Sequence, residues 1–486
     1  MIGGLIGGGL DDWEPVIGLE VHVQLHTKSK AFSASGVEFG ARPNSLTDPV
    51  VLGLPGALPT FNKAALELAL KLGVATGSQI RARSRFARKH YFYPDQPKNY
   101  QITQFDEPLC ENGQIELVGA DGVKRIKLTR IHLEEDAGKN THVGAISHID
   151  LNRAGVPLVE VVSAPELASA DEAAEFMRTL QRLVRWLEIS EADMEKGHLR
   201  CDANVSVRLR GEDRLGTRTE LKNINSFKFV HNAIEHEIAR QVRLLDEGGR
   251  VERETRLWDA DAGQSAPMRS KEEANDYRYF PDPDLPPLVV DGGMMGGILR
   301  TLPELPTSRF LRYTKELGIP VDDARTLISE RALADYFDAA MKLFPGKNGR
   351  PVANWVLTEL LGALNSEKKH ISQSPMTPET LVAVVELVET GVISGKIGKE
   401  VFDQSYTTGE APEAIVEARG VQQLSEPAVL WEVINRVVAA NPRQAEQYAQ
   451  GKDSLFGFFI GAIMKESDGR ANPVVAGELL RKRLGH

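Results

Sequence analysis

The sequence predicts an α+β N-terminal domain built on an antiparallel sheet, followed by an all-α helical domain and a small helical tail domain. Residues 17–25 and 199–209 alternate apolar and polar side chains, which is typical of strands with one buried face. After about residue 300, apolar residues recur at helical spacing instead. We therefore expect four parts: a disordered lead-in over 1–15, the sheet domain over 16–300, the helical domain over 301–405 and the tail over 406–486.

Length and composition agree with a multidomain globular protein. The 486 residues are too many for one core, and 42% hydrophobic with 26% charged residues are globular values. No apolar run approaches the roughly 20 residues that span a bilayer, so we expect no membrane association. Two cysteines, Cys110 and Cys201, exclude a disulfide framework and a four-cysteine zinc site, and they fit the reducing cytoplasm.

The first predicted strand, IGLEVHVQL over 17–25, carries Glu20 and His22 on its polar face. A carboxylate and an imidazole two residues apart point the same way from a strand. Such a pair suits a metal site or acid–base chemistry, and the alternative is an ordinary solvated strand face.

The next elements bring cations, aromatic rings and acids. Asn62 is expected to cap a helix over 62–76. Residues 81–90 hold five Arg or Lys and no acid, and aromatic residues interleave with cations over 89–105, a composition that suits bases and phosphates or simple packing. A strand over 125–133 leads into Glu134, Glu135 and Asp136, and the imperfect alternation leaves open which glutamate faces the site.

A helix and a second alternating strand follow. Ser169 and Glu172 form a capping-box pattern before an apolar helical stripe over 176–187. The strand over 199–209 places Arg200, Asp202 and Asn204 on its polar face, with a hairpin partner over 217–222 and a helix over 226–247.

Together these segments predict a polar sheet face lined with acids and flanked by cations. Several carboxylates with few soft ligands favour Mg²⁺ or Mn²⁺ over zinc. Metal-held phosphate with nearby Lys and Arg is the requirement of phosphoryl transfer. No P-loop or Rossmann motif occurs, so ATP would bind on the sheet itself. The residues alone indicate an ATP-dependent ligase or kinase.

Long ordered motifs carry a family resemblance, among them IGLEVHVQL, LGLPGALP, RKHYFYPDQPKNYQITQFD, HLEEDAGK, LRCDANVSVR and ELKNINSF. Together they resemble the B subunits of aspartyl/glutamyl-tRNA(Asn/Gln) amidotransferases, from about Val16 to the ANP motif ending at Pro473. The resemblance implies a cradle domain related to the glutamine synthetase and guanidino kinase fold, and a tail that binds tRNA. It also implies that ATP phosphorylates the side-chain carboxylate of Asp-tRNA(Asn) or Glu-tRNA(Gln), after which ammonia displaces the phosphate.

The resemblance, added to the predicted sheet face, suggests three sets of site residues. The expected Mg²⁺ ligands, with Mn²⁺ as a possible substitute, are Glu20, His22, Glu134, Glu135 and Asp202. The expected catalytic cations are Lys89, Lys98 and Arg200. The expected ATP contacts are Arg88, Lys89 and Asn204.

The resemblance also implies partners. An amidase-type A subunit would supply ammonia, and a small C subunit would bind both. The substrates would be charged tRNA(Asn), tRNA(Gln) or both. Many relatives carry a four-cysteine zinc knuckle where this chain has Ser33, Ser35, Asp48 and Val51, so we expect no zinc. Two other functions stay open: a tRNA-docking scaffold without chemistry, and a ligase that amidates a free small carboxylate.

Overall fold

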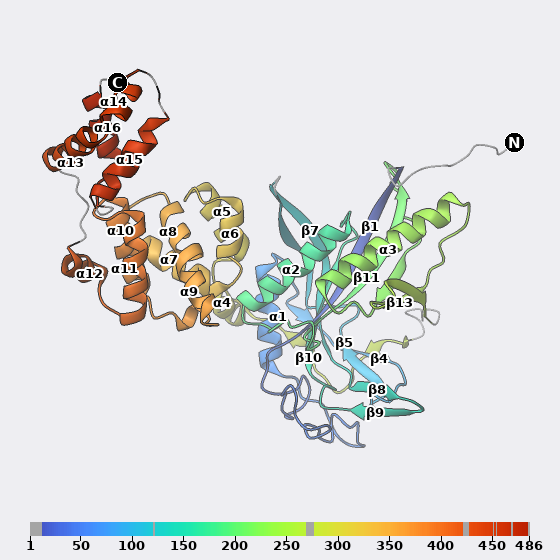
Figure 1. The fold of residues 1–486 in the computed structure, drawn as a ribbon. Coiled ribbons are helices and arrows are strands. Elements are labelled where there is room, and N and C mark those ends of the chain that lie inside the picture. The colour runs from blue at the N-terminus through green and yellow to red at the C-terminus, as the bar shows by residue number, and fades with distance from the viewer. Residues whose placement is uncertain are drawn as a thin grey trace. The chain divides into compact units, whose positions relative to one another are not determined.

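The computed structural model describes residues 12–119, 122–268, 277–420, 427–450, 452, 454–467 and 470–484. The chain forms two compact units, Met1–Thr307 and Ser308–His486 (Figure 1). Residues 1–11 of the predicted lead-in lie outside the described residues. Its end is corrected: Trp13–Pro15 are the first residues of strand β1, where the Trp13 indole donates to Asp246 Oδ1 at 3.0 Å.

A large mixed sheet organises the N-terminal unit, with strand order β14-β13-β12-β11-β1-β10-β7-β6-β2. All neighbouring pairs are antiparallel except β12 and β13. An antiparallel-dominated sheet domain is therefore confirmed. The strands are β1 (Trp13–Gln24), β2 (Gln79–Ile80), β6 (Cys110–Gly119), β7 (Gly122–Glu135), β10 (Pro157–Ser163), β11 (Leu199–Leu209), β12 (Thr219–Lys222), β13 (Thr255–Asp259) and β14 (Gln264–Pro267).

Register across the central strands fixes which polar residues meet. On β1, Glu20 lies opposite Asp202 of β11, and His22 lies opposite Arg200 of β11 and Glu160 of β10. The intervening apolar residues of β1 are buried in the main core, as the alternation predicts. One face of the sheet is thus core, and the other carries the polar row.

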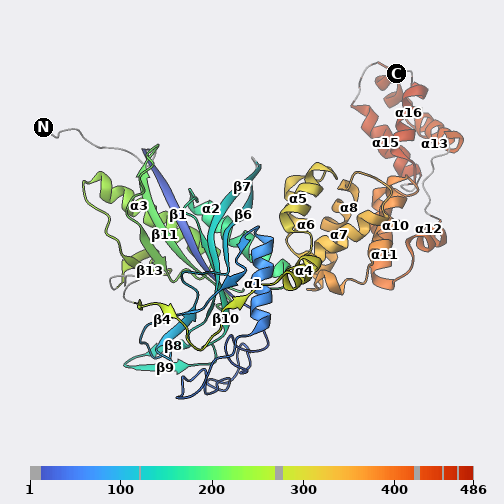
Figure 2. The same cartoon turned by 180° about the vertical axis from the view of Figure 1, so that it is seen from behind.

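Helices cover the apolar face. Helix α1 (Lys63–Ala75) has Asn62 as its N-cap, and α2 (Ala170–Trp186) has Ser169, whose Oγ accepts from Glu172 N at 3.1 Å. Both caps confirm the sequence predictions. Helix α2 packs beside α3 (Phe227–Asp246), and the pair lies along one face of the sheet (Figures 1 and 2).

Smaller sheets flank the large one. Residues 91–99 form neither helix nor strand, and the residues on either side of them form two strands of a three-stranded sheet of order β15-β4-β5. Its strands are β4 (Ala87–His90), β5 (Tyr100–Thr103) and β15 (Phe280–Pro281), and β5 contacts β7. The other small sheets pair β3 (Arg83–Ser84) with β16 (Leu288–Val289), and β8 (Lys139–Val143) with β9 (Ile146–Asp150).

The C-terminal unit is helical, as predicted. It contains α6 (Val321–Leu327), α7 (Arg331–Leu343), α8 (Arg350–Asn354), α9 (Leu361–Ser366), α10 (Pro378–Glu389), α11 (Gly395–Thr408), α12 (Pro412–Arg419), α13 (Pro427–Ala440), α14 (Pro442–Ala449), α15 (Leu455–Glu466) and α16 (Pro473–Leu484). Helix α4 (Gly292–Thr301) ends the N-terminal unit, and α5 (Pro306–Lys315) crosses the boundary between the units.

Two further features of the helices bear on the predicted organisation. The predicted limit at residue 405 falls inside α11, while α13 to α16 share a hydrophobic core of their own. Over the described residues, no helix has the length and apolar character to cross a membrane.

Candidate active site

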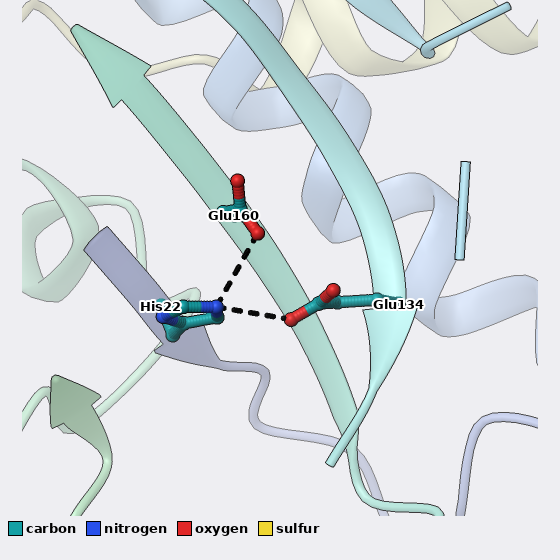
Figure 3. A group of neighbouring side chains, drawn as sticks. All are labelled: His22, Glu134 and Glu160. Carbon is teal, nitrogen blue, oxygen red and sulfur yellow. Dashed lines mark ion pairs between the residues drawn. The ribbon is translucent and has the colours of Figure 1, made fainter. Parts of the chain in front are cut away.

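Three side chains from adjacent strands converge on the polar face of the sheet. His22 Nε2 of β1 lies 3.3 Å from Glu134 Oε1 of β7 and 3.3 Å from Glu160 Oε2 of β10 (Figure 3). One potential ligand atom from each residue lies within 4.8 Å of the other two. The buried His132 adds a second imidazole, with its Nε2 3.7 Å from Glu160 Oε2 and 3.8 Å from Glu134 Oε2.

Electrostatics bind the three side chains together. Burial acts to lower the pKa of His22, but contacts with Glu134 and Glu160 outweigh it and raise the pKa to about 10. Burial acts to raise the pKa of both carboxyls, yet the neighbouring imidazoles hold both below the ordinary value. Two carboxylates this close repel each other, so positive charge is needed between them. The protonated His22 ring supplies it here.

The donor set fits a divalent metal ion. Carboxylate oxygens suit Mg²⁺ and Mn²⁺, and one imidazole is compatible with Mn²⁺ in particular. The Nε2–H of an imidazolium points along one direction and satisfies one acceptor well, whereas Glu134 and Glu160 approach Nε2 at equal distances. A divalent metal ion in place of that proton would contact His22, Glu134 and Glu160 together.

A second polar group lies one pleat along the same face. Asn204 Nδ2 donates to Glu20 Oε1 at 3.0 Å, and Lys222 Nζ donates to Asp202 Oδ2 at 2.6 Å. Glu20 and Asp202 are cross-strand partners. The structure therefore places these two predicted metal ligands beside the three-ligand group, with an amide and an ammonium as their partners.

The remaining predicted ligand, Glu135, points away from that group. Its carboxylate forms an ion pair with Lys98 and accepts from Ile102 N at 3.0 Å. Adjacent residues of a strand face opposite sides, so β7 presents Glu134 to His22 and Glu135 to Lys98. The predicted cation Arg200 binds Asp136, with its Nη2 2.9 Å from Asp136 Oδ1.

The two cations of β4 also face opposite ways. Arg88 binds Asp282 and Asp284, each at 2.8 Å, and stacks over Tyr100. Burial acts to lower the pKa of Lys89, but Tyr279 and Glu134 outweigh it and the pKa is raised. Lys89 is thus the strand cation that lies near the carboxylate group.

Glu160 was not among the predicted site residues. In the segment PLVEVVS, Glu160 is the only acid and stands between two buried valines. A single polar residue in an apolar strand is also typical of a strand at the edge of a sheet. Its alternation with Val159 and Val161 was the available signal, since it places Glu160 on the polar face. Its pairing with His22 needed the strand order, which the sequence pattern does not provide.

Neither cysteine resembles a nucleophile. Cys110 begins β6 and Cys201 lies in β11, and both are buried. Burial raises the pKa of the Cys110 thiol to about 12 and that of Cys201 well above its ordinary value.

The segment that replaces a zinc knuckle is joined by hydrogen bonds. Val51 N donates to Asp48 Oδ1 at 2.9 Å, and Lys30 N donates to Ser35 O at 3.0 Å. Ser35 N in turn donates to Ser33 Oγ at 3.3 Å. The absence of zinc stays a prediction for metal analysis of the purified chain.

Comparisons with known proteins cover nearly the whole chain. A family model described as the GatB/GatE catalytic domain matches residues 15–296, and one described as a GatB domain matches residues 335–484. The chain is 52% identical over 477 residues to the B subunit of the aspartyl/glutamyl-tRNA(Asn/Gln) amidotransferase of Geotalea uraniireducens, covering 97% of this chain and 99% of that one. The corresponding protein of Persephonella marina is 47% identical over 473 residues, covering 97% of this chain and 100% of its own.

Proposed function

This chain belongs to the family of aspartyl/glutamyl-tRNA(Asn/Gln) amidotransferase B subunits, and we propose that its polar sheet face is where the reaction of that enzyme takes place. As a B subunit it acts in an ATP-dependent amidotransferase that converts Asp-tRNA(Asn) or Glu-tRNA(Gln) to the amidated product. It works with an amidase-type A subunit, which releases ammonia from glutamine, and a small C subunit.

The reaction needs an activated carboxylate. A carboxylate is a poor electrophile, so ATP transfers its γ-phosphoryl group to the side-chain oxygen, giving an acyl phosphate and ADP. Ammonia then attacks the acyl carbon, the C–O bond to phosphate breaks, and the amide and inorganic phosphate leave. Both steps require charge neutralisation around phosphate oxygens.

The convergence of His22, Glu134 and Glu160 carries the proposal. These residues would hold the divalent ion, which would neutralise phosphate charge when bound. Lys89 provides positive charge beside them and would pair with the substrate carboxylate or the γ-phosphate. Half-burial of this face limits water, which protects an acyl phosphate from hydrolysis.

In this proposal, ATP binds at the second polar group, which contains Glu20, Asp202, Asn204 and Lys222. Lys222 lies between Asp202 and Glu220, and it joins Asn204 and Glu20 on one row of the sheet. We assign ATP to this row because it adjoins the three-ligand group and offers amide and ammonium donors. Mg²⁺ as the physiological ion, the likeness to the glutamine synthetase fold and tRNA binding by the tail are parts of the same proposal.

Reconstitution tests the proposal. The chain is combined with A and C subunits, ATP, glutamine and each misacylated tRNA, and the amidated aminoacyl ester and ADP are measured. Wild type should form both, and Glu134→Gln should form neither at an appreciable rate. The control Glu116→Gln removes only an exposed ion pair with Arg125 and should behave as wild type. Wild-type amidation by the Glu134 variant would show that this chain is a scaffold or that the site lies elsewhere.

A further inference from the structure

Three aromatic rings gather where the small β15-β4-β5 sheet ends. Phe105 follows β5, while Tyr277 and Tyr279 precede β15. The rings of Phe105 and Tyr279 stack with centroids 4.1 Å apart and planes 7° apart. Tyr277 meets Tyr279 edge-on at 6.1 Å. We call these three residues the aromatic platform.

The platform borders the carboxylate group. Lys89 Nζ lies 4.8 Å from the centroid of the Tyr277 ring, and Glu134 is among the groups that raise the pKa of the same ammonium. Thr103 Oγ1 donates to Glu134 Oε2 at 3.4 Å. Phe105 is two residues beyond Thr103, a backbone reach of at most roughly 7 Å. A molecule on the platform would therefore lie beside the Lys89 ammonium and close to the strand residue that contacts Glu134.

The platform is accessible, because the Phe105 ring is 42% exposed. The Lys89 ammonium beside Tyr277 adds a cation to these rings. Phe280 lies apart from the platform, because it pairs with Arg88 and stacks on His90, on the opposite side of β4 from Lys89. An exposed stack of rings with a cation beside it is typical of surfaces that bind unpaired nucleobases.

The substrate of the proposed function has a matching shape. Its reacting carboxylate is joined through an ester to the terminal nucleoside of the unpaired 3′ end of tRNA. When that carboxylate lies beside His22 and Glu134, the terminal base must lie close to the same two residues, because the amino acid and the ribose join it to the carboxylate. We propose that Phe105, Tyr277 and Tyr279 bind this terminal nucleobase by stacking, an assignment that rests on the proposed function.

The polar row of the large sheet favours the RNA end over the base of ATP as the occupant of the platform. That row, to which we assign ATP, is carried by Glu20 of β1 and Asp202 of β11. The platform approaches the site from Thr103, which contacts Glu134 of β7, and β10 lies between β7 and β1. ATP in the polar row therefore leaves the platform to the terminal nucleobase.

Steady-state kinetics of the reconstituted complex test the assignment. Phe105→Ala should raise KM for misacylated tRNA roughly tenfold, which corresponds to the loss of one stacking contact. Saturating kcat and KM for ATP should not change, and Phe105→Trp should restore KM. The control Phe39→Ala removes a ring that is 66% exposed and outside the platform, and it should leave KM for tRNA unchanged.

A binding measurement separates the platform from the chemistry. Deacylated tRNA with and without its terminal adenosine is titrated into wild-type and Phe105→Ala complexes. Removal of the adenosine should weaken binding to wild type roughly tenfold and leave the variant unaffected. Equal losses in both complexes would overturn the assignment, as would a variant that changes only KM for ATP. An inactive wild-type complex would refute the proposed function, whereas an active one with an unaffected Phe105 variant would refute only the platform.

Discussion

Glu160 contributes one of the two carboxylates that face His22, and its side chain is only 13% exposed. We predict that Glu160→Gln weakens divalent metal binding at least tenfold, because it removes one of three ligands but keeps the shape of the side chain. Mn²⁺ titration followed by electron paramagnetic resonance measures the affinity. Glu166→Gln, which removes an exposed contact with Lys127, is the matched control. Equal affinities of the two variants would place the metal elsewhere.

Lys30 is fully buried, and its Nζ donates to Ala154 O at 2.7 Å and Leu151 O at 3.2 Å. Burial lowers its pKa to about 8, despite Asp48 and Glu135, from 10.5 in the unfolded chain. Between these two pH values the unfolded state binds the proton and the folded state does not, so the free energy of unfolding should rise with pH.

This rise in stability is measurable against a variant that lacks the amine. From pH 7.5 to 9.5, wild type should gain about 1–2 kcal/mol relative to Lys30→Met, because one pKa unit corresponds to about 1.4 kcal/mol. Urea unfolding of both proteins at the two pH values gives the comparison. A difference that stays constant with pH would show that Lys30 keeps its proton in the folded state.

Strand β4 presents two adjacent cations to opposite sides, which makes them a matched pair. Lys89→Met should lower kcat for amidation at least tenfold with little loss of stability, because Lys89 lies near Glu134. Arg88→Met should instead lower the free energy of unfolding by about 3 kcal/mol, because it leaves the buried Asp282 carboxylate without its partner. Amidation kinetics and urea unfolding separate the effects, and a reversed pattern would contradict this placement.

The sequence pattern predicts single strands better than their neighbours. The alternation of β1 and β11 correctly placed Glu20, His22, Asp202 and Asn204 on one polar face. It could not show that β10 lies beside β1, and so Glu160 was missed. Which of Glu134 and Glu135 faces His22 also depends on distant chain segments, because Glu135 forms an ion pair with Lys98. Local periodicity determines which face a residue occupies, whereas long-range strand pairing determines what it meets.

The same difference applies to the larger elements. The caps Asn62 and Ser169 are local hydrogen-bond patterns and were predicted to the residue. The strands β4 and β5 flank the irregular residues 91–99, which include Pro94 and Pro97. Their pairing with each other and with β15, about 180 residues later by sequence number, supplies order that local composition does not indicate.

The division of labour within the enzyme leads to a prediction for the isolated protein. A glutaminase needs an activated nucleophile, and both thiols of this chain are buried with raised pKa values. The pure chain should therefore release no ammonia from glutamine above background, and the A subunit should restore release. A coupled ammonia assay on the chain alone and on the reconstituted complex makes the comparison. Appreciable ammonia from the chain alone would contradict the assignment.

A truncated chain tests the proposal that the tail binds tRNA. Helices α13 to α16 pack around their own core, so the chain ending at residue 420 should keep both the sheet site and the preceding helices folded. Because this truncation removes the basic last turn of α16, it should raise KM for tRNA roughly tenfold and leave KM for ATP unchanged.

Point variants in the full chain distinguish charge from bulk. Lys482 and Arg483 are exposed on α16, and neutralising both to Gln should reduce the salt dependence of tRNA binding by a slope of about 2 on a log–log plot. Lys342→Gln with Lys347→Gln removes two exposed charges outside the tail and is the control. If the tail pair and the control pair change the slope equally, tRNA is not held by this helix end. Any loss of tRNA affinity in the truncated chain would then come from other contacts of α13 to α16 and not from the charges at the end of α16.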